Sequence, residues 1–315
     1  MIRIVQLFIF IYYIVCDYED IDYPIPFQQL ITKRENHYVS IATNNSILPS
    51  FILTTEIPRF TNHSSDMLLI TGSDDQYFYN AINTIYEIVL ADPYASILFV
   101  DCGLSSSHMK DLSFHFQTIH IIQSKMKSNG FLAYRQLNRS IYPNWMLKGI
   151  PAFSIKSIIL EDVFWEWQGV VGWIDSDYGI ADKLSQALTI VRQYGIYSSC
   201  IDMNVSERLC DSTIHFLFDS HVLTSKVIQA NLCMGEVLLV DFQKKESHSF
   251  LSILTRCGYT EKCIASRECS DESGVALSLL LNEYRIPTRA SMRLQKKQSV
   301  KSLVKQIQEN YHVQL

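Results

Sequence analysis

Short uninterrupted apolar runs alternate in this chain with longer stretches that carry apolar residues at helical spacing. Residues 67–71 read Met-Leu-Leu-Ile-Thr and end at a turn, and residues 77–90 then place apolar side chains on one helical face. Further apolar runs stand at residues 96–100, 119–122 and 169–174. Strands that alternate with helices of this length predict an α/β fold with a mostly parallel sheet and helices on both faces.

The second half of the chain is patterned less regularly. We expect helices over residues 181–194, 246–256 and 273–284 and a strand over residues 235–240. A chain of 315 residues with 48% hydrophobic content can bury the core of one large domain. The expected organisation is a leader or short anchor over 1–16, a stem over 17–64, the domain over 65–285, and a basic helix or tail over 286–315.

The N-terminus is typical of a secretory leader. Arg3 is followed by an apolar segment up to Cys16, and Asp17 begins an acidic stretch. An apolar helix of that length spans about 20 Å, short of the roughly 30 Å hydrocarbon core of a bilayer. We therefore expect a cleaved signal peptide, with a retained anchor that tethers the chain to a membrane as the alternative. The predicted location is the secretory pathway, in the endoplasmic reticulum or Golgi lumen or outside the cell.

Glycosylation sequons and cysteines agree with that compartment. Sequons begin at Asn44, Asn62, Asn138 and Asn204. The eight cysteines include no C-x-x-C pair, which favours disulfides over zinc ligation for Cys257, Cys263 and Cys269. Cys102, inside an apolar run, is the candidate for a buried free thiol. The net charge of -5 gives no reason to expect a nucleic-acid partner.

The most informative segment for function is the end of the strand expected at residues 169–174. Asp175 and Asp177 follow it with one residue between them, which places two carboxylates at the carboxyl edge of the sheet. One carboxylate could ligate a divalent cation that bridges a diphosphate, while the other reaches the ribose or the metal through water. The alternative is an acidic turn or a cap of the next helix.

Two more places along the chain are candidates for donor binding. The turn after the first strand, with Thr71, Gly72 and Ser73 ahead of two aspartates, could recognise a base or ribose or simply cap the following helix. Lys156 lies in the amphipathic stretch before the Trp173 strand, where it either meets a phosphate or is solvated. Trp173 is the tryptophan placed to touch a ligand.

The order of several motifs resembles a known family. These motifs are residues 70–73, residues 97–104, the Lys156 helix, residues 173–177, the Cys-Ile-Ala segment 263–265 and the Asp-Glu-Ser segment 271–273. Between Asp66 and Glu283 they are similar to a nematode-expanded secreted or membrane-anchored family, domain of unknown function 1647. That family resembles the GT-A nucleotide-diphospho-sugar transferases, whose fold is Rossmann-related.

The resemblance implies a GT-A-like fold, nucleotide-sugar donors of the UDP-sugar type and a manganese-like divalent cation. It assigns Asp175 and Asp177 to the metal, Lys156 to phosphate and Asp271 to the acceptor side. The chain departs from the family in its fuller D-x-D and in Glu272-Ser273-Gly274 after Asp271. A histidine suited to be a third metal ligand is also not evident.

The leading hypothesis is a metal-dependent glycosyltransferase that moves a sugar from a nucleotide-sugar to a glycan or protein hydroxyl. Asp271 or Glu236 is the candidate catalytic base. A secreted glycan- or protein-binding module that keeps the fold without catalysis is the alternative. A metal-dependent hydrolase using the same acidic edge is a third reading.

Overall fold

The computed structural model describes the greater part of the chain after residue 66. The described residues are 67–142, 144, 146, 152–164, 166–167, 169–176, 184–208, 213, 230–264, 277–279, 281, 286 and 298–312. All belong to one compact unit, Glu35–Leu315. Among them, no helix is both long and apolar enough to cross a membrane. The expected leader and stem lie outside the described residues and stay predictions, as do the expected domain boundaries.

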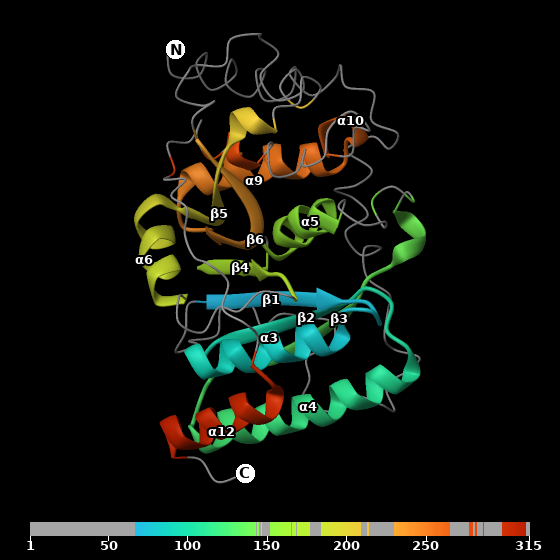
Figure 1. Ribbon diagram of the computed structural model, residues 1–315, viewed down its shortest axis with the longest axis vertical. Helices are drawn as coiled ribbons and strands as arrows, with labels where there is room; N and C mark the ends of the chain where they lie inside the picture. The colour runs from blue at the N-terminus through green and yellow to red at the C-terminus, as the bar shows by residue number, and fades with distance from the viewer. Residues whose placement is uncertain are drawn as a thin grey trace, which may run out of the picture. The chain divides into compact units, whose positions relative to one another are not determined.

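A six-stranded sheet forms the centre of this unit (Figure 1). Its strands are β1 (Met67–Ser73), β2 (Ser96–Asp101), β3 (Leu132–Gln136), β4 (Val170–Ile174), β5 (Ile196–Asn204) and β6 (Asn231–Asp241). They lie in the order β3-β2-β1-β4-β6-β5. Only β6 runs against the others, since it pairs antiparallel with both β4 and β5. The mostly parallel α/β sheet predicted from the sequence is confirmed.

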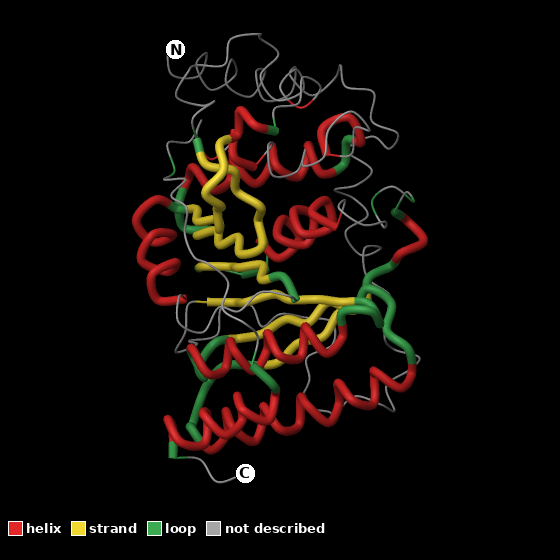
Figure 2. Tube along the Cα trace, viewed as in Figure 1, coloured by secondary structure: helices red, strands yellow, loops and turns green. Residues whose placement is uncertain are grey.

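Helices cover both faces of the sheet, as Figure 2 shows by colour. The described helices are α3 (Phe78–Ala91), α4 (Ser106–Lys125), α5 (Ala152–Phe164), α6 (Leu184–Tyr194), α9 (Lys245–Gly258), α10 (Glu261–Ile264) and α12 (Val300–Tyr311), with short 3-10 turns at Arg139–Ile141 and Val205–Glu207. Apolar side chains of α3, α4, α6 and α12 share one core layer with one face of the sheet. Those of α5 and α9 share the second layer with the other face. Burial on both sides explains why β1 and β2 are almost continuously apolar.

The position of β1 determines where a ligand can approach the sheet. From β1 the chain passes through α3 to β2 and through α4 to β3, so these strands extend the sheet on one side. The chain then returns through α5, on the opposite face, to β4 on the other side of β1. Strand order therefore reverses between β1 and β4. In open α/β sheets, ligands bind outside the carboxyl ends of the strands at such a reversal.

The prediction of a strand at residues 119–122 is wrong. This run is the last part of α4, and the strand that pairs with β2 is Leu132–Gln136. Leu112, Phe116 and Ile119 repeat at intervals of four and three and are buried, whereas Ile121 is exposed. Four residues of a helical period were mistaken for a strand because a short apolar run does not reveal its own period.

A disulfide joins β5, the last strand in the order of the sheet, to its neighbour β6. Cys200 on β5 and Cys233 on β6 face each other across the antiparallel pair and are bonded. A second disulfide joins Cys257, on α9, to Cys263, on α10. The expectation of disulfides for Cys257 and Cys263 is confirmed, while Cys269 lies outside the described residues.

The C-terminal helix docks on the body of the domain. Leu303 and Ile307 of α12 are fully buried in the core layer of α3. The Tyr311 hydroxyl donates to the carbonyl oxygen of Leu90, at 2.8 Å. The basic residues Lys301 and Lys305 lie on the exposed face of this helix.

Truncating the apolar contact of α12 should destabilise the whole domain. Ile307→Ala removes a fully buried side chain, so we expect the free energy of unfolding to fall by roughly 2–5 kcal/mol. Lys305→Ala is the matched control, because that side chain is 76% exposed and its ion pair with Glu309 contributes little. Urea denaturation measures both. Equal, small effects would mean that α12 does not pack on α3 in solution.

Candidate functional site

Asp175 ends β4 at the carboxyl edge of the sheet, and two side chains hold its carboxylate. The Lys156 ammonium donates to Oδ2 at 2.6 Å, and the Trp173 indole Nε1 donates to Oδ1 at 2.6 Å. Trp173 and Asp175 lie two residues apart and so on the same face of β4, the face covered by α5. The structure thus brings together three residues that the sequence singled out separately.

Lys156 is a buried cation in this group. Only 7% of the residue is exposed, and it projects from α5, whose apolar residues fill the core beneath β1 and β4. A buried charge is stable only if it is paired and hydrogen-bonded. Asp175 supplies this pairing, so the two residues depend on each other.

The divalent cation expected at Asp175 stays a prediction. Within the described part of the chain, no three His, Cys, Asp or Glu residues are grouped as a metal site would need. Asp177, the second expected ligand, lies outside the described residues.

Glu236 approaches Asp175 from the antiparallel strand β6. The carbonyl oxygen of Glu236 accepts from the Asp175 backbone N–H at 2.7 Å, directly after the last β4–β6 register pair, Ile174 with Val237. The Glu236 carboxylate accepts from the Ser199 hydroxyl at 2.8 Å, and that hydroxyl accepts from the Val237 N–H. The candidate base Glu236 therefore lies at the same edge as Asp175, whereas Asp271 lies outside the described residues.

The end of β1 supplies the neighbouring part of the edge. A Cβ atom on Gly72 would stand 2.5 Å from the Val100 carbonyl oxygen, so the close packing of β1 against β2 itself requires glycine there. Thr71 and Ser73 are buried, and their hydroxyls have no hydrogen-bond partner among the described residues. By strand alternation both point to the α3 face, away from Lys156. Their role in donor binding stays a prediction.

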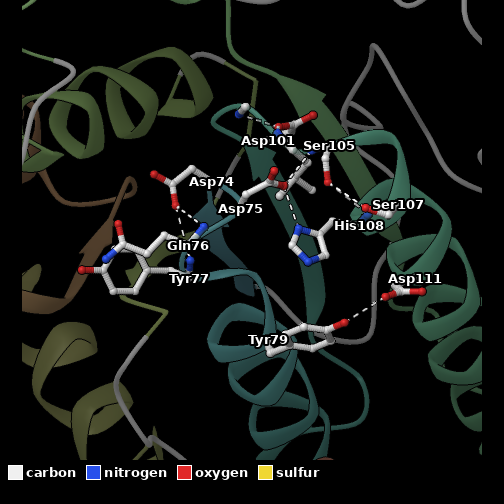
Figure 3. Close-up of polar contacts among 12 residues, drawn as sticks. Asp74, Asp75, Gln76, Tyr77, Tyr79, Asp101, Ser105, Ser107, His108 and Asp111 are labelled. Atoms are coloured by element: carbon white, nitrogen blue, oxygen red, sulfur yellow. Dashed lines mark hydrogen bonds and ion pairs between the residues drawn. The ribbon is translucent and has the colours of Figure 1, made fainter.

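The two aspartates of the first turn serve different contacts, as Figure 3 shows. Asp74 Oδ1 accepts from the backbone N–H groups of Gln76 and Tyr77, which closes the turn that leads into α3. Asp75 Oδ1 accepts from the Ser105 N–H and contacts His108 Nδ1, each at 2.7 Å. These contacts hold the turn after β1 against the turn after β2.

The contacts of Asp75 with Ser105 and His108 also favour its charged form. The pKa of Asp75 is lowered, first by the hydrogen bond from the Ser105 backbone and then by His108. The carboxylate therefore keeps its charge at neutral pH. The His108 ring stacks on Phe78, with centroids 4.4 Å apart. His108 is a contact that sequence reasoning missed, because its position in an ordinary helical stretch gave no signal.

Asp101 organises the turn after β2. Its side chain is buried and accepts from the N–H groups of Gly103 and Leu104 and from the Tyr134 hydroxyl, at 2.6, 2.7 and 2.5 Å. Burial and the neighbouring Asp101 raise the pKa of Tyr134, so its hydroxyl stays protonated as the donor. Arg139, also missed from the sequence, donates from Nη1 to the Cys102 carbonyl oxygen at 2.9 Å. The turn is thus held by residues of β2, β3 and the 3-10 turn Arg139–Ile141.

Comparison with known proteins finds similarity only among solved structures. No protein-family model and no curated protein matches the chain. The galactosyltransferase LgtC with donor and acceptor sugar analogues is 12% identical, with a TM-score of 0.44, over 77% of this chain and 96% of LgtC. The mannosyltransferase Ktr4p of S. cerevisiae with GDP is 9% identical, with a TM-score of 0.39, over 86% and 79%.

A third solved structure, the bifunctional glycosyltransferase WbbM, is 10% identical with a TM-score of 0.42. The alignment covers 74% of this chain but only 39% of WbbM. Alignments at these identities and TM-scores do not transfer an activity or a site to another chain. Membership of the nematode family named above stays a prediction.

Cys102 should resist alkylation in the folded protein. It is unpaired and partly buried, and burial, followed by the charges of Asp101 and Asp74, raises its pKa to about 12. Only about one thiol in ten thousand is then ionised at pH 8, and the thiolate is the reactive form. We expect the Cys102 peptide to stay unlabelled by iodoacetamide until guanidinium is added, as read by peptide mass spectrometry. Rapid labelling of the native protein would contradict this environment.

Proposed function

We propose that this chain is a glycosyltransferase that uses a nucleotide-sugar donor and a hydroxyl of a glycan or protein acceptor. The observation that carries the proposal is the meeting of Lys156, Asp175 and Glu236 at the carboxyl edge where strand order reverses between β1 and β4. A cation can stabilise the charge of a leaving diphosphate, and a carboxylate can accept the proton of the acceptor hydroxyl.

We assign the nucleoside end of the donor to the turns after β1 and β2. Backbone groups there are held in place by Asp74, Asp75 and Asp101, so the turns are rigid before a ligand arrives. The diphosphate then lies at the end of β4, where Lys156 offsets its charge. Trp173 positions Asp175 through the indole hydrogen bond and thereby fixes the ammonium group.

Transfer needs a group that takes a proton from the acceptor. The acceptor oxygen bonds to the anomeric carbon, and the bond from that carbon to the diphosphate oxygen breaks. The nucleoside diphosphate leaves with the electron pair, and the hydroxyl proton passes to a carboxylate. We assign this role to Glu236, whose backbone carbonyl oxygen accepts from the Asp175 N–H and whose carboxylate accepts from the Ser199 hydroxyl.

The compartment belongs to the same proposal. Within the described part of the chain, disulfides join Cys200 to Cys233 and Cys257 to Cys263, and such bonds persist in oxidising compartments. Together with the N-terminal apolar segment and the four sequons, they support a chain that acts in the secretory pathway. There it would use donors supplied to the lumen.

One observation favours the alternative of a binding module without catalysis. Both oxygens of Asp175 already accept hydrogen bonds, and Glu236 accepts one from Ser199. A binding module would keep these contacts for stability alone. It would recognise a glycan or a protein without consuming a donor.

Replacing the proposed base separates the two functions. Glu236→Gln keeps a side-chain oxygen for Ser199 but cannot take a proton, so we expect transfer to fall roughly 10²- to 10⁴-fold while UDP or GDP binding is unchanged. Asp202→Asn, an exposed acid on the neighbouring strand β5, is the matched control. Sugar transfer from a panel of UDP- and GDP-sugars to glycan acceptors is measured by product mass.

Two results would contradict the proposal. Absence of transfer and of donor hydrolysis across the whole panel, with glycan binding intact, would assign the chain to the binding modules. Full activity in Glu236→Gln would show that Glu236 is not the base, although the proposed transfer activity itself would stand.

A further inference from the structure

We infer that the side-chain nitrogen of Asn204 carries an N-linked oligosaccharide. The inference rests on the luminal compartment stated with the proposed function, but not on the transfer reaction at Asp175. The sequons that begin at Asn138 and Asn204 lie among the described residues, and of these two asparagines Asn204 is the exposed one. What motivates the inference is that the fold uses the oxygen of this side chain but not its nitrogen.

Asn204 stands where β5 ends and the 3-10 turn Val205–Glu207 begins. Asn204 and Glu207 form a capping box, in which the Glu207 carboxylate accepts from the Asn204 backbone N–H at 3.1 Å. A capping box uses the side-chain oxygen of its first residue as an acceptor. In the described part of the chain, the Asn204 Nδ2 makes no hydrogen bond. An N-linked sugar replaces one hydrogen of that nitrogen and keeps the oxygen, so the capping box survives the modification.

The residues after Asn204 present the sequon in a fixed conformation. Val205 is fully buried, and its backbone N–H donates to the Ala230 carbonyl oxygen at 2.9 Å. Ser206, the third residue of the sequon, is exposed, as Asn204 is. The middle residue therefore anchors the segment to the core, while the two residues that define the sequon stay accessible.

The sequon lies at the end of a two-stranded extension of the sheet. The last register pair of β4 with β6 is Ile174 with Val237, whereas β5 and β6 stay paired as far as Asn204 with Asn231. At about 3.3 Å per residue, that end of the pair lies roughly 20 Å along β6 from the end of β4. The disulfide between β5 and β6 holds the two strands of this extension together. An exposed residue at its end can take a large hydrophilic group without displacing the core.

The modification is a transfer made by an enzyme of the secretory lumen and not by this chain. The donor class is an oligosaccharide linked to a lipid diphosphate. A bond forms between the Asn204 Nδ2 and the anomeric carbon, and the bond from that carbon to the diphosphate oxygen breaks. The lipid diphosphate leaves with the electron pair, and the nitrogen loses one proton to a base of the transferring enzyme.

Peptide mass spectrometry of the full chain, produced with its own N-terminus in eukaryotic secretory cells, tests the site. Peptide N-glycosidase in heavy-oxygen water converts a glycosylated asparagine to an aspartate that carries the heavy isotope. We expect this label at Asn204. Digestion in the same water without the glycosidase identifies spontaneous deamidation.

Matched variants separate loss of the sugar from loss of the fold. Asn204→Asp keeps an acceptor oxygen for the turn but cannot be glycosylated, and Ser206→Ala keeps the asparagine but breaks the sequon. Each should remove the gel mobility shift of one oligosaccharide. Ser206→Thr keeps the sequon and should retain that shift. Thermal denaturation after enzymatic removal of the sugars verifies that every variant is folded.

The outcomes distinguish this inference from the proposed function. An unlabelled Asn204 in a chain that intact microsomes protect from protease would overturn the inference and leave the compartment standing. An unlabelled Asn204 in a chain that protease digests outside intact microsomes would overturn the compartment and the inference together. Transfer from nucleotide-sugars is tested separately by Glu236→Gln.

Discussion

The pairing of β1 with β2 on one side and β4 on the other is the constraint on which the rest of this structure depends. It leaves β1 buried on both faces and sends the helices after β1 and before β4 to opposite sides of the sheet. Helix α3 therefore packs on one face of the sheet and α5 on the other. Residues far apart in sequence, such as Lys156 and Asp75, come to one edge for this reason.

At that edge, most of the carboxylates stabilise the structure through hydrogen bonds. The carboxylates of Asp74, Asp75 and Asp101 accept hydrogen bonds from backbone N–H groups and thereby stabilise the turns. Asp175 is satisfied by Lys156 and Trp173. The end of β4 therefore carries a buried ammonium and a carboxylate whose two oxygens both accept hydrogen bonds.

Much of this arrangement could be predicted from the sequence, and the reasons for the exceptions are physical. Continuous apolar runs revealed β1, β2 and β4 because strands buried on both faces carry no alternation. The strand predicted at residues 119–122 was wrong because a run of four residues fits a helix equally well. β5 was not expected because the residues of its second half are mostly exposed and form no apolar run. Lys156 and Asp175 were both named, but their direct contact depends on the packing of α5 beneath β4, which no local pattern encodes.

The indole N–H of Trp173 reports most directly on whether a nucleotide diphosphate binds at this edge, because it donates to Asp175. Its resonance in a ¹H–¹⁵N spectrum is assigned by loss in Trp173→Phe. Titration with UDP or GDP should shift this signal and leave that of Trp167, which precedes β4 at the opposite edge, in place. An unmoved Trp173 signal at saturating concentrations of both nucleotides would contradict the account.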